Sequence, residues 1–129
     1  MYLPKIVITT FVTASYVLAA PSVLESRAVD VGYGQQLQNS DQTNHWVVWI
    51  EGESACPATR TLSSLLTSPC NQYFTLAGER YKFVNCNGNN EPQAVKDATG
   101  SIVRSCELEH DKINCHNGIH DIVKHGKCV

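Results

Sequence analysis

The chain has 129 residues, of which 43% are hydrophobic and 17% charged, a length that corresponds to one globular domain at most. The sequence contains ten Lys and Arg residues and twelve Asp and Glu residues, which gives a formal net charge of −2. The chain therefore lacks the basic excess of a phosphate-driven nucleic-acid binder or of a basic interfacial helix. We expect a monomer with neither nucleic acid nor a stably inserted membrane as a partner.

Residues 1–19 are typical of a secretory signal peptide. Lys5 precedes an apolar run from Ile6 to Ala20, and Ala19 and Ala20 are small residues that suit signal peptidase. The run of about 15 residues is shorter than the roughly 20 that span a bilayer. We expect cleavage after Ala19 and a secreted, extracellular protein.

Residues 20–27 are expected to form a propeptide. Leu24 and Arg27 bound the sequence LESR, which resembles the Leu-x-x-Arg site at which fungal secreted proproteins are cut by a subtilisin-like protease. An uncleaved N-terminus is the alternative. Residues 28–44 are rich in Gly, Gln and Asn and are predicted to be a flexible segment. Residues 45–129 are predicted to form the disulfide-rich globular domain.

Six cysteines make the framework of that domain. An even number of cysteines in a small secreted chain is typical of disulfide bonding. No C-x-x-C pair occurs, which disfavours structural zinc. The sequence does not choose among the possible pairings of Cys56, Cys70, Cys86, Cys106, Cys115 and Cys128.

The strongest predicted strand is His45–Glu51, with the sequence HWVVWIE. Alternation places Trp46, Val48 and Ile50 on one face and Val47 and Trp49 on the other. Both faces are apolar, so this strand is expected to be central and covered on both sides.

A helix is predicted over Ser54–Pro69, because Ser54 is a good N-cap and five apolar residues follow at helical spacing. Those five residues are Ala55, Ala58, Leu62, Leu65 and Leu66. A hairpin is predicted next, between Tyr73–Leu76 and Tyr81–Cys86. Its expected register sets Phe74 opposite Phe83 and Leu76 opposite Tyr81.

The segment Asn90–Gly100 has two interpretations. Asn90 as an N-cap and Gly100 past the end favour a short helix, whereas Asp97–Gly100 also resembles a hairpin turn. We favour the helix. A strand is expected over Ser101–Leu108.

Asn117–Gly118 is a two-residue hairpin signal. Pairing outward from it places Ile113 opposite Ile122 and Asp111 opposite Lys124 on one face, together with Cys115 and His120. Lys112, Asn114 and Asp121 lie on the other, mostly polar face. The clean separation of the two faces supports this register.

Together these elements predict an α+β fold, a small ferredoxin-like (split β-α-β) sandwich stapled by disulfides, with an extra C-terminal hairpin. A small all-β domain is the alternative if Asn90–Gly100 is not helical.

Residues suited to catalysis or metal binding are scattered. Histidines cluster near the C-terminus, but the turn signal at Gly118 separates His116 from His120, and the predicted pair His110 and His125 lacks a third ligand. We predict no metal and no cofactor. A ribonuclease would draw on His45, Glu51, Glu53, Arg60 and Arg80, whose spacing is not diagnostic. We therefore predict that the protein is not an enzyme.

The signal peptide, the LESR site and the six-cysteine body together resemble the small secreted cysteine-rich proteins of filamentous fungi. The predicted order of elements resembles their KP6 killer-toxin-like group. This resemblance implies an effector that binds a host protein or another secreted protein, in the host apoplast or inside a host cell. An antimicrobial or killer toxin is the alternative, and a small hydrolase such as a ribonuclease is the second alternative.

The surface predicted to carry binding combines three parts of the chain. One is Trp49, if it is partly open. The second is the loop from Asn85 to Glu91, which is dense in Asn and Gly. The third is the polar face of the final hairpin. The residues named for these parts are Trp49, Asn87, Asn89, Asn90, Lys112, Asn114 and Asp121.

Overall fold

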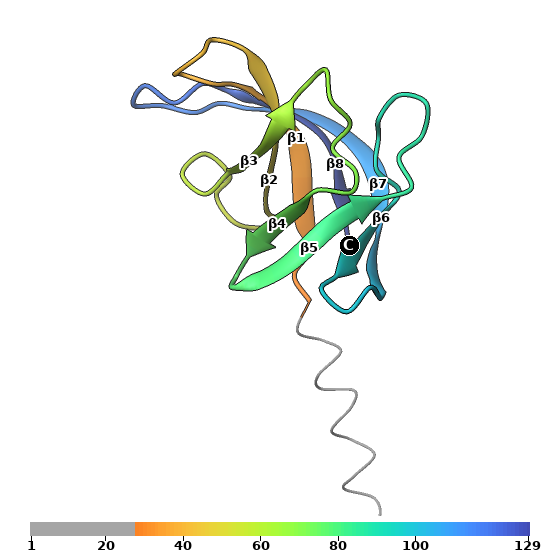
Figure 1. The fold of residues 1–129 in the computed structure, drawn as a ribbon. Coiled ribbons are helices and arrows are strands. Elements are labelled where there is room, and N and C mark those ends of the chain that lie inside the picture. The colour runs from red at the N-terminus through yellow and green to blue at the C-terminus, as the bar shows by residue number, and fades with distance from the viewer. Residues whose placement is uncertain (1–27) are drawn as a thin grey trace, which may run out of the picture.

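The computed structural model describes residues 28–129, which form eight antiparallel strands. The strands follow the order β3-β2-β1-β8-β7-β6-β5-β4 in one sheet that curls into a nearly closed barrel (Figure 1). In this part of the chain there is no helix, and hence none long and apolar enough to cross a membrane. The predicted signal peptide and the processing residues Leu24 and Arg27 lie outside the described residues.

The predicted α+β ferredoxin-like class is therefore wrong, and the all-β alternative describes the fold. The strands are β1 Val31–Leu37, β2 Asn44–Ile50, β3 Arg60–Ser64, β4 Tyr73–Leu76, β5 Glu79–Val84, β6 Ala94–Asp97, β7 Ile102–Ile113 and β8 Ile122–Cys128.

β1 is an interior strand, third in the order of the sheet, and it lies in the segment predicted to be flexible. It pairs with β2 on one side and with β8 on the other. Gly32 and Gly34 are the reason that this strand was missed. A Cβ added at Gly32 would collide with the Trp49 ring, and one at Gly34 would lie 2.8 Å from Cα of Lys124. These glycines allow neighbouring groups to approach closely.

β2 confirms the predicted central strand with two apolar faces. Trp46 and Val48 point into the barrel and join its main core, whereas Val47 and Trp49 point outward. The outward pair is covered by Ala55, which belongs to the loop after β2. Because both faces are covered, Trp49 is only 2% exposed and cannot offer the partly open contact surface that we predicted.

The helix predicted over Ser54–Pro69 is absent. Its apolar residues do not form one buried stripe, because Ala55 joins the outer cluster while Leu62 and Leu65 pack on the barrel core. Leu66 is 96% exposed. A Thr- and Ser-rich stretch instead forms β3 and pairs with β2, so tertiary pairing overrides the helical spacing.

The helix favoured over Asn90–Gly100 is also wrong, and the hairpin turn is correct. The Asp97 carboxylate accepts hydrogen bonds from the backbone N–H groups of Thr99 (2.9 Å) and Ser101 (3.1 Å). Gly100 adopts a φ of 90°, which favours glycine. These local bonds stabilise the turn between β6 and β7.

The hairpin of β4 and β5 is confirmed, but its register differs from the predicted one by two residues. Phe74 lies opposite Tyr81, and the connection consists of Ala77 and Gly78. A shift of two residues keeps each side chain on its face. Phe74 and Phe83 therefore still pack together inside the barrel, with ring centroids 5.1 Å apart.

The final hairpin forms as predicted. Ile113 lies opposite Ile122 and Asp111 opposite Lys124, and Asn117 and Gly118 both have positive φ. The hairpin of β1 and β2 lies beside it (Figure 1). The two are joined by hydrogen bonds from Gln36 to the His120 carbonyl (2.7 Å) and from Asn39 to the Gly118 carbonyl (3.0 Å).

All six cysteines are paired, as predicted, in the bonds Cys56–Cys115, Cys70–Cys86 and Cys106–Cys128. The first holds the loop after β2 against the outside of the barrel. The other two staple the barrel wall, because their cysteines pack on the main core. The order of paired strands ends at β3 and β4, where the Gln72 amide reaches Ser63 Oγ at 3.1 Å.

Candidate functional site

His125 occupies an irregular position in the sheet. Between β1 and β8 the register shifts beside Tyr33 and Gly34, so His125 is an extra residue in β8. Between β7 and β8 it shifts again, so Glu109 and His110 together face His125. Bulges of this kind redirect side chains. Here the bulge turns the imidazole of His125 toward the inside of the barrel, where it meets the ring of Trp46.

The His125 ring has three neighbours there. Its Nδ1 lies 3.1 Å from one Glu91 carboxylate oxygen and 3.3 Å from the other. The Trp46 ring meets it edge-on with centroids 5.0 Å apart, and the His110 ring lies at 6.1 Å. The carboxylate favours a proton on Nδ1, which leaves Nε2 of a neutral His125 as an acceptor.

Burial distinguishes these groups. Glu91 and Trp46 are buried, His125 is partly buried and His110 is exposed. The indole N–H of Trp46 has no hydrogen-bond partner within residues 28–129. Tyr33 is fully buried nearby, so its pKa is raised well above the ordinary value, mainly by burial and also by the negative charge of Glu91.

The opposite side of the sheet holds an ion-pair network. Lys124 is buried and contacts the carboxylates of Glu51 (2.7 Å) and Glu109 (2.5 Å). Lys127 also reaches Glu109, at 2.9 Å. Hydrogen bonds from Lys124 and Lys127 lower the pKa of Glu109 to about 2. Lys124 adjoins His125, so this network fastens β8 and β7 behind the His125 position.

We name the inward-facing, solvent-accessible side of the β7–β8 ribbon the histidine face. Leu108 is 58% exposed and Val123 is 40% exposed, and they flank the two imidazoles. Lys112 pairs with Val123 across the ribbon. The histidine face therefore combines apolar, cationic and imidazole groups on one rigid ribbon, and consists of Leu108, His110, Lys112, Val123 and His125.

The structure brings together two segments that the sequence assigned to one binding surface. Lys112 and Asp121 lie on the same side of the final hairpin, with Lys112 Nζ and the Asp121 carboxylate 3.5 Å apart. Glu91 ends the Asn-rich loop and contacts His125. The base of the Asn-rich loop therefore adjoins the histidine face.

Several predicted binding residues have local structural roles. The Asn87 side chain accepts hydrogen bonds from the N–H groups of Asn89 (2.9 Å) and Glu91 (3.1 Å). Asn90 adopts a φ of 60°, which asparagine tolerates better than most residues. Asn114 is exposed, and its carbonyl lies next to Cys56. The Asn residues thus shape the loop, and a role of theirs in binding stays a prediction.

The residues considered for a ribonuclease do not form one site. His45 contacts Thr43 and Asp41, and Glu51 pairs with Lys124 on the outside of the sheet. Arg80 lies 4.0 Å above the ring of Tyr73. The remaining two, Glu53 and Arg60, lie in the turn after β2 and at the start of β3.

Metal-ligand geometry is equally incomplete. His116 and His120 flank the Asn117–Gly118 turn and do not lie on a helix. Across residues 28–129, no three His, Cys, Asp or Glu residues are grouped to hold a metal ion.

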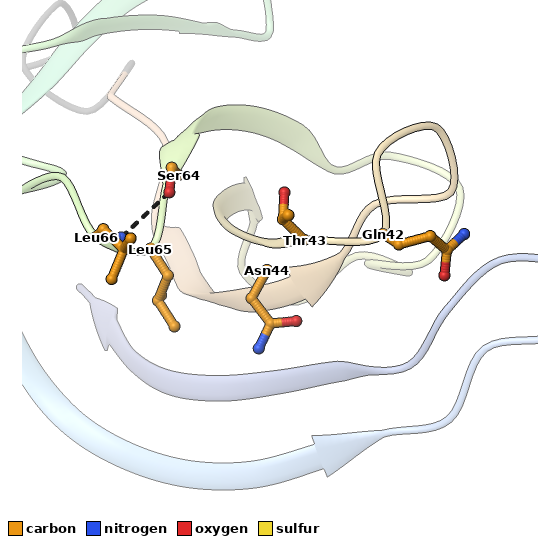
Figure 2. Close-up of a pocket in the computed structure, with 6 residues that line it drawn as sticks. All are labelled: Gln42, Thr43, Asn44, Ser64, Leu65 and Leu66. Atoms are coloured by element: carbon orange, nitrogen blue, oxygen red, sulfur yellow. Dashed lines mark hydrogen bonds between the residues drawn. The ribbon is translucent and has the colours of Figure 1, made fainter.

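A shallow groove lies between the start of β2 and the turn after β3 (Figure 2). Its lining comes from Gln42 to Asn44 and from Ser64 to Leu66. The Leu66 N–H is hydrogen-bonded to Ser64 Oγ at 3.3 Å. The groove has no charged residue and no imidazole, so it offers less chemistry than the histidine face.

The sequence-based prediction named residues of the Asn-rich loop and of the final hairpin, and it did not name His125 as a binding residue. It placed His125 opposite His110, yet nothing in the spacing indicated that Glu91 would contact His125. The signal that could have helped is the pair His125–Gly126. A glycine beside a polar residue within a strand suggests a bulge.

No protein-family model matches the sequence, no curated protein is significantly similar to it, and no solved structure matches it. The resemblance to fungal effectors and to the KP6-like group therefore stays a prediction.

Proposed function

We propose that this chain is a secreted, disulfide-stabilised protein that acts by binding a protein partner through the histidine face, without catalysis. The observation that carries this proposal is the Glu91–His125 contact. It joins the Asn-rich loop to a ribbon on which Leu108 and Val123 are exposed beside two imidazoles. Contiguous apolar patches rimmed by polar residues mark protein-binding surfaces, and Leu108 and Val123 supply the apolar part of such a surface here.

The scaffold supports the same proposal. Three disulfides suit an oxidising environment such as the extracellular space. The ribbon is held from behind by Lys124 and its two carboxylates, so the face is rigid before it meets a partner. A preorganised surface loses little conformational entropy on binding.

The experiment combines infiltration of plant tissue with treatment of microbial cultures, because the effector and toxin alternatives predict responses in different organisms. Leu108→Asp and Val123→Asp place charge on the histidine face, and each is expected to abolish the response while the protein stays folded and oxidised. Leu66→Asp is the matched control, since Leu66 is more exposed than Leu108 but lies at the groove after β3. Full activity of both face variants would contradict the proposal.

A second candidate function, a small hydrolase, is favoured by one specific observation. Glu91 orients His125, and His110 offers a second imidazole at 6.1 Å, so the two rings could serve as general base and general acid. Hydrolysis of RNA by the purified protein is the direct assay. Loss of a positioned acid or base typically lowers the rate by about 100-fold or more.

Substitutions of the two histidines distinguish the two functions. Catalysis requires His110→Ala and His125→Asn each to abolish turnover, with His45→Ala as a control outside the site. Binding requires RNA to remain intact in the presence of the unmodified protein, while Leu108→Asp and Val123→Asp abolish the biological response. Cleavage of RNA that depends on His110 and His125 would replace the binding proposal with the hydrolase.

A further inference from the structure

The outer face of β4, β5 and β6 gathers positive charge on a chain whose net charge is negative. Lys82 lies between the buried residues Tyr81 and Phe83, so alternation points it outward. Lys96 follows the buried Val95 and points outward in the same way. β4 and β5 lie at the front of Figure 1.

One row of side chains crosses four strands on this face. Tyr73 pairs with Lys82, Lys82 with Lys96, and Lys96 with Ile102. At about 4.8 Å between neighbouring strands the row spans roughly 14 Å. Its two ends are apolar and exposed, with Tyr73 at 48% and Ile102 at 57%. Arg80 lies 4.0 Å above the Tyr73 ring, beside the row.

The cations of this face differ from the others that the structure describes. Arg104, Lys112, Lys124 and Lys127 each contact a carboxylate. Within residues 28–129, Arg80, Lys82 and Lys96 have no acidic partner, and Arg60 on β3 is the remaining cation of this kind. Three of the four unpaired cations in the described part of the chain therefore lie together.

The strand register also keeps acidic residues away from this face. Glu79 pairs with Leu76 and Asp97 with Tyr81, and both partners are buried in the barrel core. Alternation therefore assigns Glu79 and Asp97 to the inward-facing rows. Lys82 directly opposite Lys96 is an unfavourable pair for a sheet, since like charges across strands destabilise it. A ligand of opposite charge would offset that repulsion.

The apolar ends of the row identify the class of ligand. An anionic polymer would contact the cations but would gain little from an exposed Ile102. Arg80 lies 4.0 Å and Lys82 5.1 Å from the centroid of the Tyr73 ring, so a nucleic-acid base would compete with these cations for stacking on the ring. A membrane surface uses both features, because lysine and arginine bind anionic headgroups while tyrosine and isoleucine enter the interfacial layer.

We propose that the outer face of β4, β5 and β6 docks the protein on an anionic phospholipid membrane. Arg80, Lys82 and Lys96 contact the headgroups, and Tyr73 and Ile102 enter the layer beneath them. This docking is peripheral and involves no spanning segment. It is independent of the histidine face and gives an antimicrobial or killer-toxin activity a physical basis that the net charge alone did not suggest.

The test is co-sedimentation of the purified, oxidised protein with vesicles. Phosphatidylcholine vesicles containing phosphatidylglycerol are compared with pure phosphatidylcholine, at low and high NaCl. We expect binding only to the anionic vesicles, weakened by salt. Lys82→Gln should lower the partition coefficient about fivefold, and Lys82→Gln with Lys96→Gln about 30-fold. Arg60→Gln is the matched control for loss of an unpaired cation and should bind normally.

Two further arms distinguish the source of the negative charge. Ile102→Ser should weaken vesicle binding severalfold, because the isoleucine contributes only if it enters lipid. Soluble heparin and single-stranded RNA should bind the protein more weakly than the anionic vesicles do. The proposal is overturned if the protein ignores anionic vesicles at low salt, if the double lysine variant or Ile102→Ser binds normally, or if only the soluble polymers bind. Leu108→Asp should retain vesicle binding, which separates this test from that of the histidine face.

Discussion

Gly126 is the position at which the bulge that directs His125 can be tested most sharply. A Cβ added there would lie 2.7 Å from Cζ of Tyr33, and it would collide with the Tyr33 hydroxyl and the Glu107 carbonyl oxygen. The perturbation is Gly126→Ala, which adds one methyl group. Gly88→Ala is the matched control, because a Cβ at Gly88 meets nothing within 4 Å and its φ is not positive.

The magnitude follows from how far the neighbours must move. Ordinary contacts between carbon atoms lie at about 3.5–4.0 Å, so the Tyr33 ring must retreat by roughly 1 Å. Tyr33 is fully buried, and the Glu107 carbonyl belongs to the neighbouring strand, so neither moves freely. Overpacking of this kind costs about 1–3 kcal/mol. For a domain of about 100 residues, that lowers the melting temperature by roughly 5–20 °C.

Thermal unfolding followed by circular dichroism measures this effect on the oxidised protein. Gly88→Ala should melt within about 2 °C of the unmodified chain, because surface substitutions rarely change stability by more than about 0.5 kcal/mol. A melting temperature of Gly126→Ala as high as that of Gly88→Ala would contradict the clash with Tyr33. In that case Tyr33 would not pack against β8 as described, and the geometry that turns His125 inward would be wrong.

Three other predictions concern charge and disulfides. Lys96→Gln should raise the free energy of unfolding in urea by about 0.2–1 kcal/mol, because it removes the repulsion from Lys82; an unchanged or lower value would contradict that repulsion. Lys124 and Lys127 lower the pKa of Glu109 to about 2, whereas its pKa in the unfolded chain is about 4.5. The Glu109 carboxylate therefore contributes its full stabilisation above about pH 4.5, and this contribution is lost as the pH falls toward 2. Glu109→Gln should flatten acid unfolding in this window, and an unaltered acid profile would argue against the network. Removing Cys56–Cys115, which spans 59 residues, should cost about 4 kcal/mol against about 3 for Cys70–Cys86, which spans 16; the reverse order in denaturant melts would exclude the loop-closure argument.

The parts of the fold that sequence predicted well are those in which local chemistry and pairing agree. Asn117 and Gly118 tolerate positive φ, and the apolar alternation around them favours only one register, so the final hairpin was correct. The two apolar faces of β2 required two covering layers, which the structure supplies from the barrel core and from Ala55.

The predictions that were wrong concern segments in which tertiary contacts override the local sequence pattern. Leu62 and Leu65 have helical spacing with Ala55, but they pack in a different cluster, and only the tertiary structure decides between the two. Gly32 and Gly34 appeared to mark flexibility, whereas each accommodates a group from another strand. The contact between Glu91 and His125 joins residues 34 positions apart through a bulge, so no local pattern could have predicted the centre of the site.

The place of β8 between β1 and β7 determines the order in which the secreted chain can mature. Cys70 and Cys86 can pair as soon as β4 and β5 have emerged, since the bond lies within a local hairpin. The other two bonds require Cys115 and Cys128, which lie near the C-terminus. β1 pairs with β2 on one side, and its partner on the other side is β8, the last strand. In a nascent chain that has not yet reached Ile122, β4 and β5 can therefore already be linked by Cys70–Cys86 while one edge of β1 is still unpaired. During that interval β1 needs protection from other chains, and closure by β8 is the step that ends it.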